Sequence, residues 1–411
     1  MEILFVSTSC SKRKYKEVFN MRNRKLIDPQ QKFCNLLIEG MSMCEGVCLT
    51  SISALPVSAS TVSQRFFKEE EEVISSNLTY KYLPFINGKI MRYLTLFVNA
   101  YKAAKLWVQA NDGKEKVIVC DVLSYYVTRP IQIVAKKYRI KVVGIVTDLP
   151  LLATNMKKRK ESIVKRIGLS VFQHLINNSI RNYDAYIPLT KSIDEVVNPD
   201  RKPSLIIEGS VDYSEQTNMK IVEKKKVVLY AGGIYEKYGL KNLVEAFMKS
   251  ETHDYELHIY GEGSYVEKLS AIEKMCPKIK YMGMATLDEI VHHEREAMLL
   301  INPRPSDEEF SKYSFPSKTL EYMASGTPLL TTRLPGIPEE YFQYTFTFQD
   351  ESVNGMAGTI CNICHMSQDE LARKGIEAYN FVLAEKSNII QGKRIVDFAE
   401  YLHFVNKKND K

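Results

Sequence analysis

The sequence predicts an α/β protein with two parallel β-sheets, each covered by helices on both faces. Short apolar runs rich in β-branched residues alternate with amphipathic stretches along most of the 411 residues. This alternation is typical of a parallel sheet with crossover helices. It is interrupted by one charged passage, YSEQTNMKIVEKKK, after which it begins again. Because the chain is also long for one hydrophobic core, we expect two domains.

The strand-like runs fall into two series. The first series reads EILFVST, VCLTSIS, KVIVCDV, KVVGIVTD, AYIPLT and SLIIEGSV, with helical segments such as PQQKFCNLLIEGMSM and RPIQIVAKKYR between them. The second reads VVLYAG, YELHIYG, KIKYMGM, AMLLINP and PLLTT. From residue 369 onward only helical spacing of apolar residues remains. We therefore expect domains over residues 1–215 and 216–385, a linker near residues 213–224 that joins them, and a terminal helix over 386–411.

Composition narrows the functional classes. The 56 Lys and Arg against 49 Asp and Glu give a net charge of +7, which is too mild for a typical nucleic-acid-binding protein. Eight scattered cysteines do not resemble a disulfide framework, so a reducing compartment is expected. No signal-peptide pattern opens the sequence, and no uninterrupted apolar run is long enough to cross a bilayer. These features predict a cytoplasmic protein, either soluble or peripheral to the inner face of the cell membrane.

Glycines follow three successive strands of the second series. Gly232 and Gly233 come after the first strand, Gly261 and Gly263 after the second, and Gly283 after the third. Any one of these turns is equally consistent with a tight connection between a strand and a helix. Because ligands of open α/β sheets bind at the carboxyl ends of strands, three such turns side by side predict the rim of a binding site.

The stretch FPSKTLEYMASGTPLL predicts a short helix whose start can hold a phosphate. We expect Ser314 to cap it and Pro316 to occupy its first turn. The amides of the first turn at Ser317 and Lys318, together with the ammonium group of Lys318, would then face a phosphate or diphosphate.

Two further charged residues belong to the same prediction. Glu321 lies one turn deeper on the same helix face, where a carboxylate can accept hydrogen bonds from the two hydroxyls of a ribose. Arg304, just after a predicted strand, adds a second cation at this edge. The alternative is an ordinary surface ion pair between Lys318 and Glu321, worth about 0.2 to 0.5 kcal/mol.

The first half offers weaker candidates. Asp148 follows a predicted strand and could orient or deprotonate an acceptor hydroxyl, or could instead cap a helix. Together with Lys318 it is the candidate for catalysis. The basic turn Lys12–Lys14 could contact donor phosphates or the acceptor, or could be a solvated turn.

The segment MKKRKESIVKRIGLSVFQHLINN predicts a basic amphipathic helix. Such a helix suits an anionic membrane surface, although a helix packed on its own sheet with a solvated basic face is an equal alternative. Its cations are Lys157, Lys158, Arg159, Lys160, Lys165 and Arg166.

The motif CNICH, residues 361–365, has the spacing of a c-type haem attachment site. Haem attachment requires export, for which we see no signal, and a zinc site would need two more nearby ligands. We interpret the cysteines as packing residues and expect neither a metal nor a cofactor.

The second series also resembles a known family. The motifs VVLYAGGIYEKYGLKNLVEAF, LHIYGEGSYVEKL, IKYMGMATLDEI and FPSKTLEYMASGTPLL, in this order over residues 226–335, are similar to the C-terminal nucleotide-binding domain of glycosyltransferase family 4. The first half matches more loosely, through VGIVTDLP, YDAYIPLT and LIIEGSVD. The resemblance implies the GT-B fold, in which two Rossmann-like domains face each other across a cleft and C-terminal helices pack back on the first domain.

The resemblance also implies an activity. Family members are retaining glycosyltransferases, here of the hexosyltransferase type, that use a nucleotide-diphosphate sugar, UDP- or GDP-linked, without a metal. The second domain would hold this donor and the first an acceptor. A lipid-linked glycan of cell-surface polysaccharide biosynthesis is the acceptor that the basic helix favours. The partners expected are thus the donor, a glycan or lipid-linked acceptor and an anionic membrane surface.

The sequence departs from the family pattern at three positions. The family has two glutamates eight positions apart; the second corresponds to Glu321, whereas the first falls at Tyr313. The phosphate-binding arginine and lysine of the family fall at Gly233 and Tyr238. A GT-B nucleotide-sugar epimerase and a non-catalytic homologue that acts as a binding partner therefore stay open as alternatives.

These departures direct the phosphate contacts to other cations. We infer that Arg304 and Lys318, with Lys237, bind the diphosphate in place of the missing pair, and that backbone amides near Ser314 and Phe315 contact the sugar.

Overall fold

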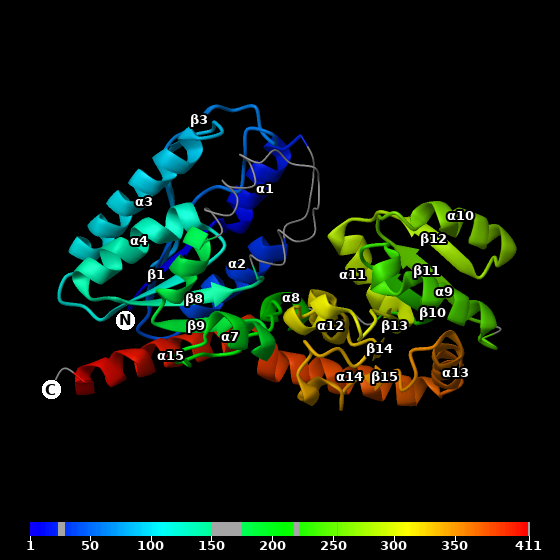
Figure 1. Ribbon diagram of the computed structural model, residues 1–411. Coiled ribbons are helices and arrows are strands. Elements are labelled where there is room, and N and C mark those ends of the chain that lie inside the picture. Colours follow the sequence, from blue (N-terminus) through cyan, green and yellow to red (C-terminus); the bar gives the residue numbers. More distant parts are fainter. Residues whose placement is uncertain (24–28, 150–173, 218–221, 253, 410–411) are drawn as a thin grey trace. The chain divides into compact units, whose positions relative to one another are not determined.

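The computed structural model describes residues 1–23, 29–149, 174–217, 222–252 and 254–409. The chain divides into two compact units (Figure 1). Unit 1 comprises Met1–Ser210 and Asn388–Lys411, and unit 2 comprises Val211–Ser387. Each unit is built around its own sheet.

Unit 1 contains a seven-stranded sheet in the order β4-β5-β2-β1-β7-β8-β9. All neighbouring strands are parallel except β4, which runs antiparallel to β5 at one edge. A two-stranded antiparallel ribbon, β3 with β6, accompanies it. The strands are β1 (Glu2–Ser7), β2 (Cys48–Ser53), β3 (Phe66–Phe67), β4 (Glu70–Ser75), β5 (Leu78–Tyr82), β6 (Phe85–Ile86), β7 (Lys116–Asp121), β8 (Lys141–Val146) and β9 (Ala185–Pro188).

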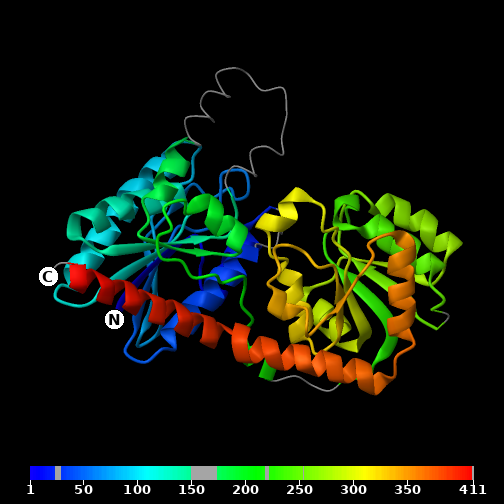
Figure 2. The ribbon, with the colours of Figure 1, turned by 60° about the horizontal axis from the view of Figure 1, so that its bottom comes forward.

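Helices cover the sheet of unit 1. They include α1 (Lys12–Met21), α2 (Pro29–Ser42), α3 (Met91–Ala110), α4 (Tyr125–Tyr138), α7 (Lys191–Val197) and α15 (Asn388–Asn409). Helices α3 and α4 lie side by side, and α15 packs on α2 (Figures 1 and 2). This packing requires small residues, because a Cβ on Gly40 would lie 1.8 Å from the Asn388 carbonyl oxygen. The expected return of the terminal helix to the N-terminal part is therefore confirmed.

Unit 2 contains a six-stranded, fully parallel sheet in the order β12-β11-β10-β13-β14-β15. Its strands are β10 (Lys225–Ala231), β11 (Glu256–Tyr260), β12 (Ile279–Gly283), β13 (Ala297–Asn302), β14 (Leu329–Thr331) and β15 (Phe346–Thr347). Its α-helices are α8 (Tyr213–Thr217), α9 (Leu240–Lys249), α10 (Val266–Met275), α11 (Leu287–Glu296), α12 (Ser317–Ala324), α13 (Val353–Cys364) and α14 (Gln368–Lys386). Short 3₁₀ turns also occur among its described residues, at η1 (Glu236–Tyr238), η2 (Glu309–Tyr313) and η3 (Glu339–Tyr341).

The sheet of unit 2 separates two apolar cores. Val228 and Tyr230 of β10 belong to one core, together with side chains of α9, α10 and α13. Val227 and Leu229 belong to the other, together with side chains of α11, α12 and α14. Because side chains alternate along a strand, both faces of β10 are buried, as expected for a parallel sheet with helices on each side. The predicted α/β class is thus confirmed.

One predicted strand is wrong. The segment SLIIEGSV, residues 204–211, forms only two isolated bridges, Ser204 with Tyr186 of β9 and Val211 with Ser387. Its amides at Leu205 and Ile207 donate to the carbonyl oxygens of Tyr186 and Pro188 at 3.0 and 3.1 Å. Pro188 has no N–H to donate in return, so the ladder cannot continue.

Candidate functional site

A small cavity opens at the carboxyl ends of β10 and β13 in unit 2. Its volume is about 90 Å³, which is the share of liquid volume of roughly three water molecules. It therefore has room for a phosphate-sized group. We call it the donor pocket; its lining residues are Tyr230, Ala231, Gly232, Gly233, Tyr238, Ile301, Asn302, Arg304, Pro316, Ser317, Lys318 and Tyr322.

The start of α12 forms one wall of the donor pocket. The helix begins at Ser317, and Pro316 is its N-cap residue with extended backbone angles, φ −70° and ψ 110°. No side chain caps this helix end. The prediction that Ser314 caps the helix is therefore wrong, since Ser314 lies two residues before the actual N-cap. An uncapped first turn leaves its amides available to an anion in the pocket.

Two buried donors of the pocket have no acceptor among the described residues. They are the side-chain amide nitrogen Nδ2 of Asn302 and the Nε of Arg304. Asn302 is only 7% exposed. A buried donor without a partner typically costs about 1 to 3 kcal/mol. Such atoms in one cavity suit an oxygen acceptor, supplied by a ligand or by water.

Arg304 is a largely buried cation whose neighbours are aromatic rings. Its guanidinium lies 4.9 Å from the Tyr238 ring centre and 5.5 Å from that of Phe310. Burial lowers the pKa of Arg304 below its ordinary value. Within the described part of the chain no carboxylate pairs with this guanidinium. The charge is therefore not neutralised within the pocket.

Lys237 contacts the same aromatic group from outside the lining. Its ammonium lies 5.0 Å from the Tyr238 ring centre and 5.9 Å from that of Phe310. Cation–π contacts stabilise a cation but do not cancel its charge. The structure thus brings Lys237 and Arg304 together around the rings of Tyr238 and Phe310.

Lys318 and Glu321 form the ion pair that the sequence left open. The ammonium of Lys318 lies 2.9 Å from Oε2 of Glu321 and 3.4 Å from Oε1 of the buried Glu294. Burial would lower the pKa of Lys318, but Glu321 and Glu294 together raise it above its ordinary value. About a third of the Lys318 side chain, 31%, is exposed. Lys318 therefore stays charged in the first turn of α12, next to the carboxylates of Glu321 and Glu294.

Two tyrosines that the sequence analysis missed hold the glycine turn in place. The hydroxyl of Tyr322, on α12, accepts from the amide of Ala231 at 2.8 Å and donates to the carbonyl of Ala231 at 3.1 Å. The hydroxyl of Tyr230 donates to the carbonyl of Gly233 at 2.9 Å. Burial raises the pKa of both hydroxyls, so both stay protonated. In the sequence, Tyr230 looks like an ordinary residue of a strand and Tyr322 like one of a helix, so neither gave a signal for this role.

The five glycines predicted at the rim take different positions. Gly232 and Gly233 line the donor pocket, whereas Gly261, Gly263 and Gly283 do not. A Cβ on Gly261 would lie 1.9 Å from the carbonyl oxygen of Gly232, and one on Gly263 would lie 2.1 Å from that of Ile234. The amide of Gly261 also donates to the carbonyl of Gly283 at 2.9 Å. Gly261 and Gly263 thus have a packing role, whereas Gly283 has open space at its Cβ position and a positive φ of 76°. Contact of these three glycines with a donor stays a prediction.

Ser314 and Phe315 directly precede Pro316 in the chain but do not line the donor pocket. The ring of Phe315 is buried and packs against Tyr341, with 5.5 Å between the ring centres. The carbonyl of Ser314 approaches Gly336, where a Cβ would lie 2.3 Å from its oxygen. The proposed contacts of their amides with a sugar remain a prediction.

The predicted site residues of unit 1 show fewer signs of a binding site than those of the donor pocket. Asp148 is exposed after β8, and its carboxylate accepts from the amide of Leu149 at 2.7 Å. The basic segment from Lys157 to Arg166 lies outside the described residues. A carboxylate that the sequence analysis missed, Asp121, ends β7 and is fully buried; it accepts from Gln30 Nε2 at 2.6 Å.

The basic turn at the start of α1 is engaged in ion pairs. Arg13 pairs with Glu70 at 3.1 Å and with Glu72 at 2.7 Å, both on β4. Lys14 also pairs with Glu70, and Lys12 lies 3.6 Å from a carboxylate oxygen of Glu39. These pairs favour a structural role over binding of a phosphate.

The CNICH motif lies on α13 and the residue after it. Cys364 packs against a core of unit 2. Cys361 and His365 contact each other, with 3.6 Å between Sγ and Nδ1. In the described parts of the chain no three His, Cys, Asp or Glu residues gather as metal ligands. No described helix has the length and apolarity to cross a bilayer.

Comparisons with known proteins agree with this geometry. Residues 225–365 match the family described as glycosyl transferases group 1, a range that contains every residue of the donor pocket. No curated protein matches the sequence.

Solved structures share the fold over the whole chain. Anabaena HepE in complex with UDP aligns with a TM-score of 0.59 and 11% identity, covering 98% of this chain and 100% of that one. Sucrose-phosphate synthase from Thermosynechococcus elongatus aligns with a TM-score of 0.62 and 14% identity, covering 98% and 100%. A trehalose-6-phosphate structure from E. coli bound with UDP-2-fluoro glucose aligns with 0.62 and 10% identity, covering 97% and 99%.

Proposed function

We propose, from the premise that this chain carries a group 1 glycosyltransferase domain in the GT-B fold, that it is a retaining glycosyltransferase. It would move a hexose from a nucleotide-diphosphate sugar to a glycan. The acceptor would be lipid-linked and would belong to cell-surface polysaccharide biosynthesis. Two of the structures similar to this chain carry UDP or a UDP-sugar, so UDP-linked donors are the first to test.

The observation that carries the proposal is the pair of buried donors in the donor pocket without an acceptor, Asn302 Nδ2 and Arg304 Nε. Phosphate oxygens would satisfy both. Beside them, the uncapped start of α12 offers amides and the positive end of the helix dipole. These groups are suited to a pyrophosphate.

Glu321 fits the remaining part of the donor. It lies one turn inside α12 and pairs at 2.9 Å with Lys318, which lines the pocket, whereas Glu321 itself lies outside the lining. Such a carboxylate can accept both hydroxyls of a ribose, while Lys318 stays close to the phosphates. The two residues would thus divide the nucleotide between them.

The same groups suggest how transfer proceeds. When the bond between the anomeric carbon and the diphosphate oxygen breaks, negative charge grows on the leaving diphosphate. The cations Arg304 and Lys318 and the helix amides are already oriented and need no rearrangement to stabilise this charge. Asp148, in unit 1, is our candidate for orienting the acceptor hydroxyl, and Lys318 for activating the leaving group.

A donor panel tests the proposal. Thermal melting with UDP- and GDP-sugars should raise the Tm for the correct donor, because a bound ligand stabilises the folded state. Glu321→Ala should weaken donor binding by about 10- to 150-fold, since a hydrogen bond to a charged group is worth about 1.5 to 3 kcal/mol. The exposed Glu267→Ala on α10 is the matched control. An unchanged dissociation constant in Glu321→Ala would remove the ribose assignment.

Assays of donor turnover then distinguish a glycosyltransferase from an epimerase and from a non-catalytic homologue. A glycosyltransferase consumes the donor with a glycan acceptor, whereas an epimerase converts the nucleotide sugar without one. Binding without either reaction would identify a non-catalytic homologue.

Location at an anionic membrane is part of the proposal and depends on the segment with Lys157–Lys160. Reversing these four charges to glutamate should abolish sedimentation with anionic vesicles, because each basic residue near such a surface contributes about 1 kcal/mol. Equal sedimentation of the wild-type and reversed proteins would exclude this segment as the membrane contact.

A further inference from the structure

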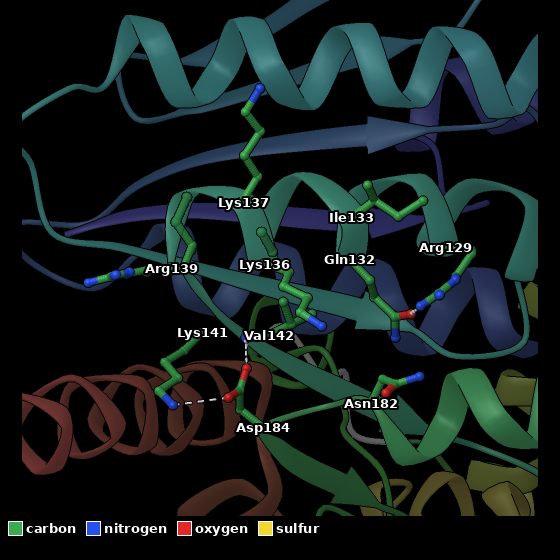
Figure 3. A pocket seen from close by; sticks show the side chains of 12 residues that line it. Arg129, Gln132, Ile133, Lys136, Lys137, Arg139, Lys141, Val142, Asn182 and Asp184 are labelled. Carbon is green, nitrogen blue, oxygen red and sulfur yellow. Dashed lines mark hydrogen bonds and ion pairs between the residues drawn. The ribbon is translucent and has the colours of Figure 1, made fainter. Parts of the chain in front are cut away.

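Unit 1 contains a cavity that is far larger than the donor pocket of unit 2, and the charged residues of its lining are cations with a single exception, Asp184. Its volume is about 800 Å³, within the range of small-molecule sites. Figure 3 shows it between α4 and the segment before β9. We call it the basic groove; its lining residues are Arg129, Gln132, Ile133, Ala135, Lys136, Lys137, Arg139, Ile140, Lys141, Val142, Asn182 and Asp184.

The basic groove and the predicted acceptor site lie at opposite edges of the sheet of unit 1. Lys141 begins β8, and Asp184 immediately precedes β9. The groove therefore lies at the amino ends of these two strands, whereas Asp148 follows the carboxyl end of β8. A ligand in this groove would be neither the donor nor the acceptor of the proposed reaction.

The charges of the groove are not balanced. Asp184 is the one acid in the lining, and its two oxygens are already used by Lys141 at 3.0 Å and by the amide of Val142 at 2.9 Å. Figure 3 shows these two contacts on the lower side of the groove. Four further cations remain in the lining, and in the described part of the chain none has a carboxylate within ion-pair distance. They are Arg129, Lys136, Lys137 and Arg139.

Arg129 is held in position by a buried neutral network. Its Nη1 donates to Oε1 of Gln132 at 3.1 Å. The same oxygen accepts from the hydroxyl of Ser179 at 2.9 Å, and Nε2 of Gln132 donates to the Ser179 carbonyl at 3.1 Å. Gln132 and Ser179 are both buried. The network fixes the guanidinium without cancelling its charge, which is how a preformed anion site is built.

Arg139 adds a backbone observation. It ends α4 in the left-handed conformation, φ 55° and ψ 39°, where glycine is the usual residue. A bulky side chain at positive φ is uncommon and carries strain, so its presence needs a reason outside the backbone. A contact between its guanidinium and a ligand in the groove would be such a reason.

Helix-end electrostatics do not account for the whole set. Cations near the end of α4, such as Lys136 and Lys137, can be explained by the negative end of the helix dipole. Arg129, in the first half of that helix, and Lys141, on a strand, cannot. In Figure 3, Arg129 and Lys136 extend from α4 toward the side of Asn182, whereas Lys137 points away. The cations of the groove thus all lie within residues 129–141, on α4, at its C-cap and at the start of β8, whereas Asn182 and Asp184 belong to a second segment.

We propose that the basic groove binds a phosphate-bearing anion, at a site separate from the donor pocket. Arg129 and Lys136, with Arg139, would hold the phosphate, and the apolar lining at Ile133, Ile140 and Val142 would cover the organic part of the molecule. This phosphate can come from a soluble phosphorylated compound or from a lipid headgroup.

Titration of the whole chain with inorganic pyrophosphate tests the site. The parent protein carries Arg304→Met, so that binding in the donor pocket is weakened. In this parent, Arg129→Gln with Lys136→Gln should raise the dissociation constant about tenfold or more. The control is Lys102→Gln with Lys105→Gln, which removes two exposed charges from α3 of the same unit, outside the lining. Sedimentation with vesicles of phosphatidylcholine and phosphatidylglycerol forms the second arm.

The two assays distinguish a soluble phosphorylated compound from a lipid headgroup as the source of the phosphate. Loss of pyrophosphate binding alone identifies a soluble compound, and loss of vesicle binding identifies a lipid headgroup; either supports the proposal. If groove and control variants lose binding equally, or if neither loses any, the proposal is overturned.

A single substitution distinguishes binding from folding. Arg139→Gly should weaken binding while the Tm stays equal or rises, because glycine accepts the left-handed conformation without strain. The matched control is Arg201→Gly, at the other arginine with positive φ, 52°, which does not line the groove and should leave binding unchanged. Wild-type binding by Arg139→Gly and by the Arg129 and Lys136 variant together would overturn the assignment.

Discussion

Replacing Arg304 by methionine should weaken binding of the nucleotide sugar by about tenfold or more and should leave the ligand-free protein equally or more stable. The affinity falls because a hydrogen bond to a charged group is worth about 1.5 to 3 kcal/mol. The stability does not fall because the guanidinium has a buried Nε without a partner and no carboxylate in the described structure. Methionine also retains the contact with the rings of Tyr238 and Phe310. Calorimetric titration and thermal melting measure the two effects.

The matched control is Arg333→Met. Arg333 also lies over an aromatic ring, Phe342, at 4.3 Å, but it pairs with Glu339 and lies outside the donor pocket. Its replacement should leave donor affinity unchanged. A lower Tm of Arg304→Met with unchanged donor affinity would show that Arg304 serves the fold and not the ligand.

Replacing Gly261 by alanine should destabilise unit 2 by on the order of 3 kcal/mol or more. The Cβ would lie 1.9 Å from the carbonyl oxygen of Gly232, and the residue has φ +130°, a conformation that other residues rarely adopt. Because the obstacle is backbone, it can yield only if the Gly232 turn moves, and that turn lines the donor pocket. Donor binding should therefore fall together with the midpoint of urea unfolding.

Gly358→Ala is the control for this substitution. Gly358 lies within α13 and has open space around its Cβ position. Alanine favours a helix over glycine by about 0.5 to 1 kcal/mol, so the control should be neutral or stabilising. An equal unfolding midpoint for Gly261→Ala and the wild type would contradict the close approach of the two turns.

The strand pattern was readable because buried parallel strands are continuous apolar runs. β1 and β13 are entirely buried, β10 is buried after its first two residues, and all three were foreseen. The edge strand β4, with the pattern EEEVIS, was not, because its exposed glutamates hide the alternation. The segment after β9 failed for a different reason, since its apolar run is strand-like but its partner strand ends in Pro188. Pairing partners are not visible in the run itself.

Part of the donor pocket could be recognised from the sequence. The glycines after β10 and the cations Arg304 and Lys318 were found because their residue types suit a phosphate at a strand end. Asn302, Tyr230 and Tyr322 were missed, because each looks like an ordinary element residue until its partner atoms are placed. The basic groove was missed because its cations, all within residues 129–141, look like those of an ordinary amphipathic helix until the second segment, with Asn182 and Asp184, is placed beside them.

By itself the sequence determined the buried parallel strands and the helices between them, that two main sheets form, and which cations and glycines follow the strands, because local spacing and residue type specify these features. Tertiary structure alone decided which donors stay without an acceptor, which glycines pack on backbone instead of lining the pocket, and which charges find a partner. These properties depend on atoms brought together from distant segments, such as Lys318 with Glu294 or Gly261 with Gly232. Hydrogen bonding and steric contact act between such atoms within a few ångströms, whatever their separation along the chain.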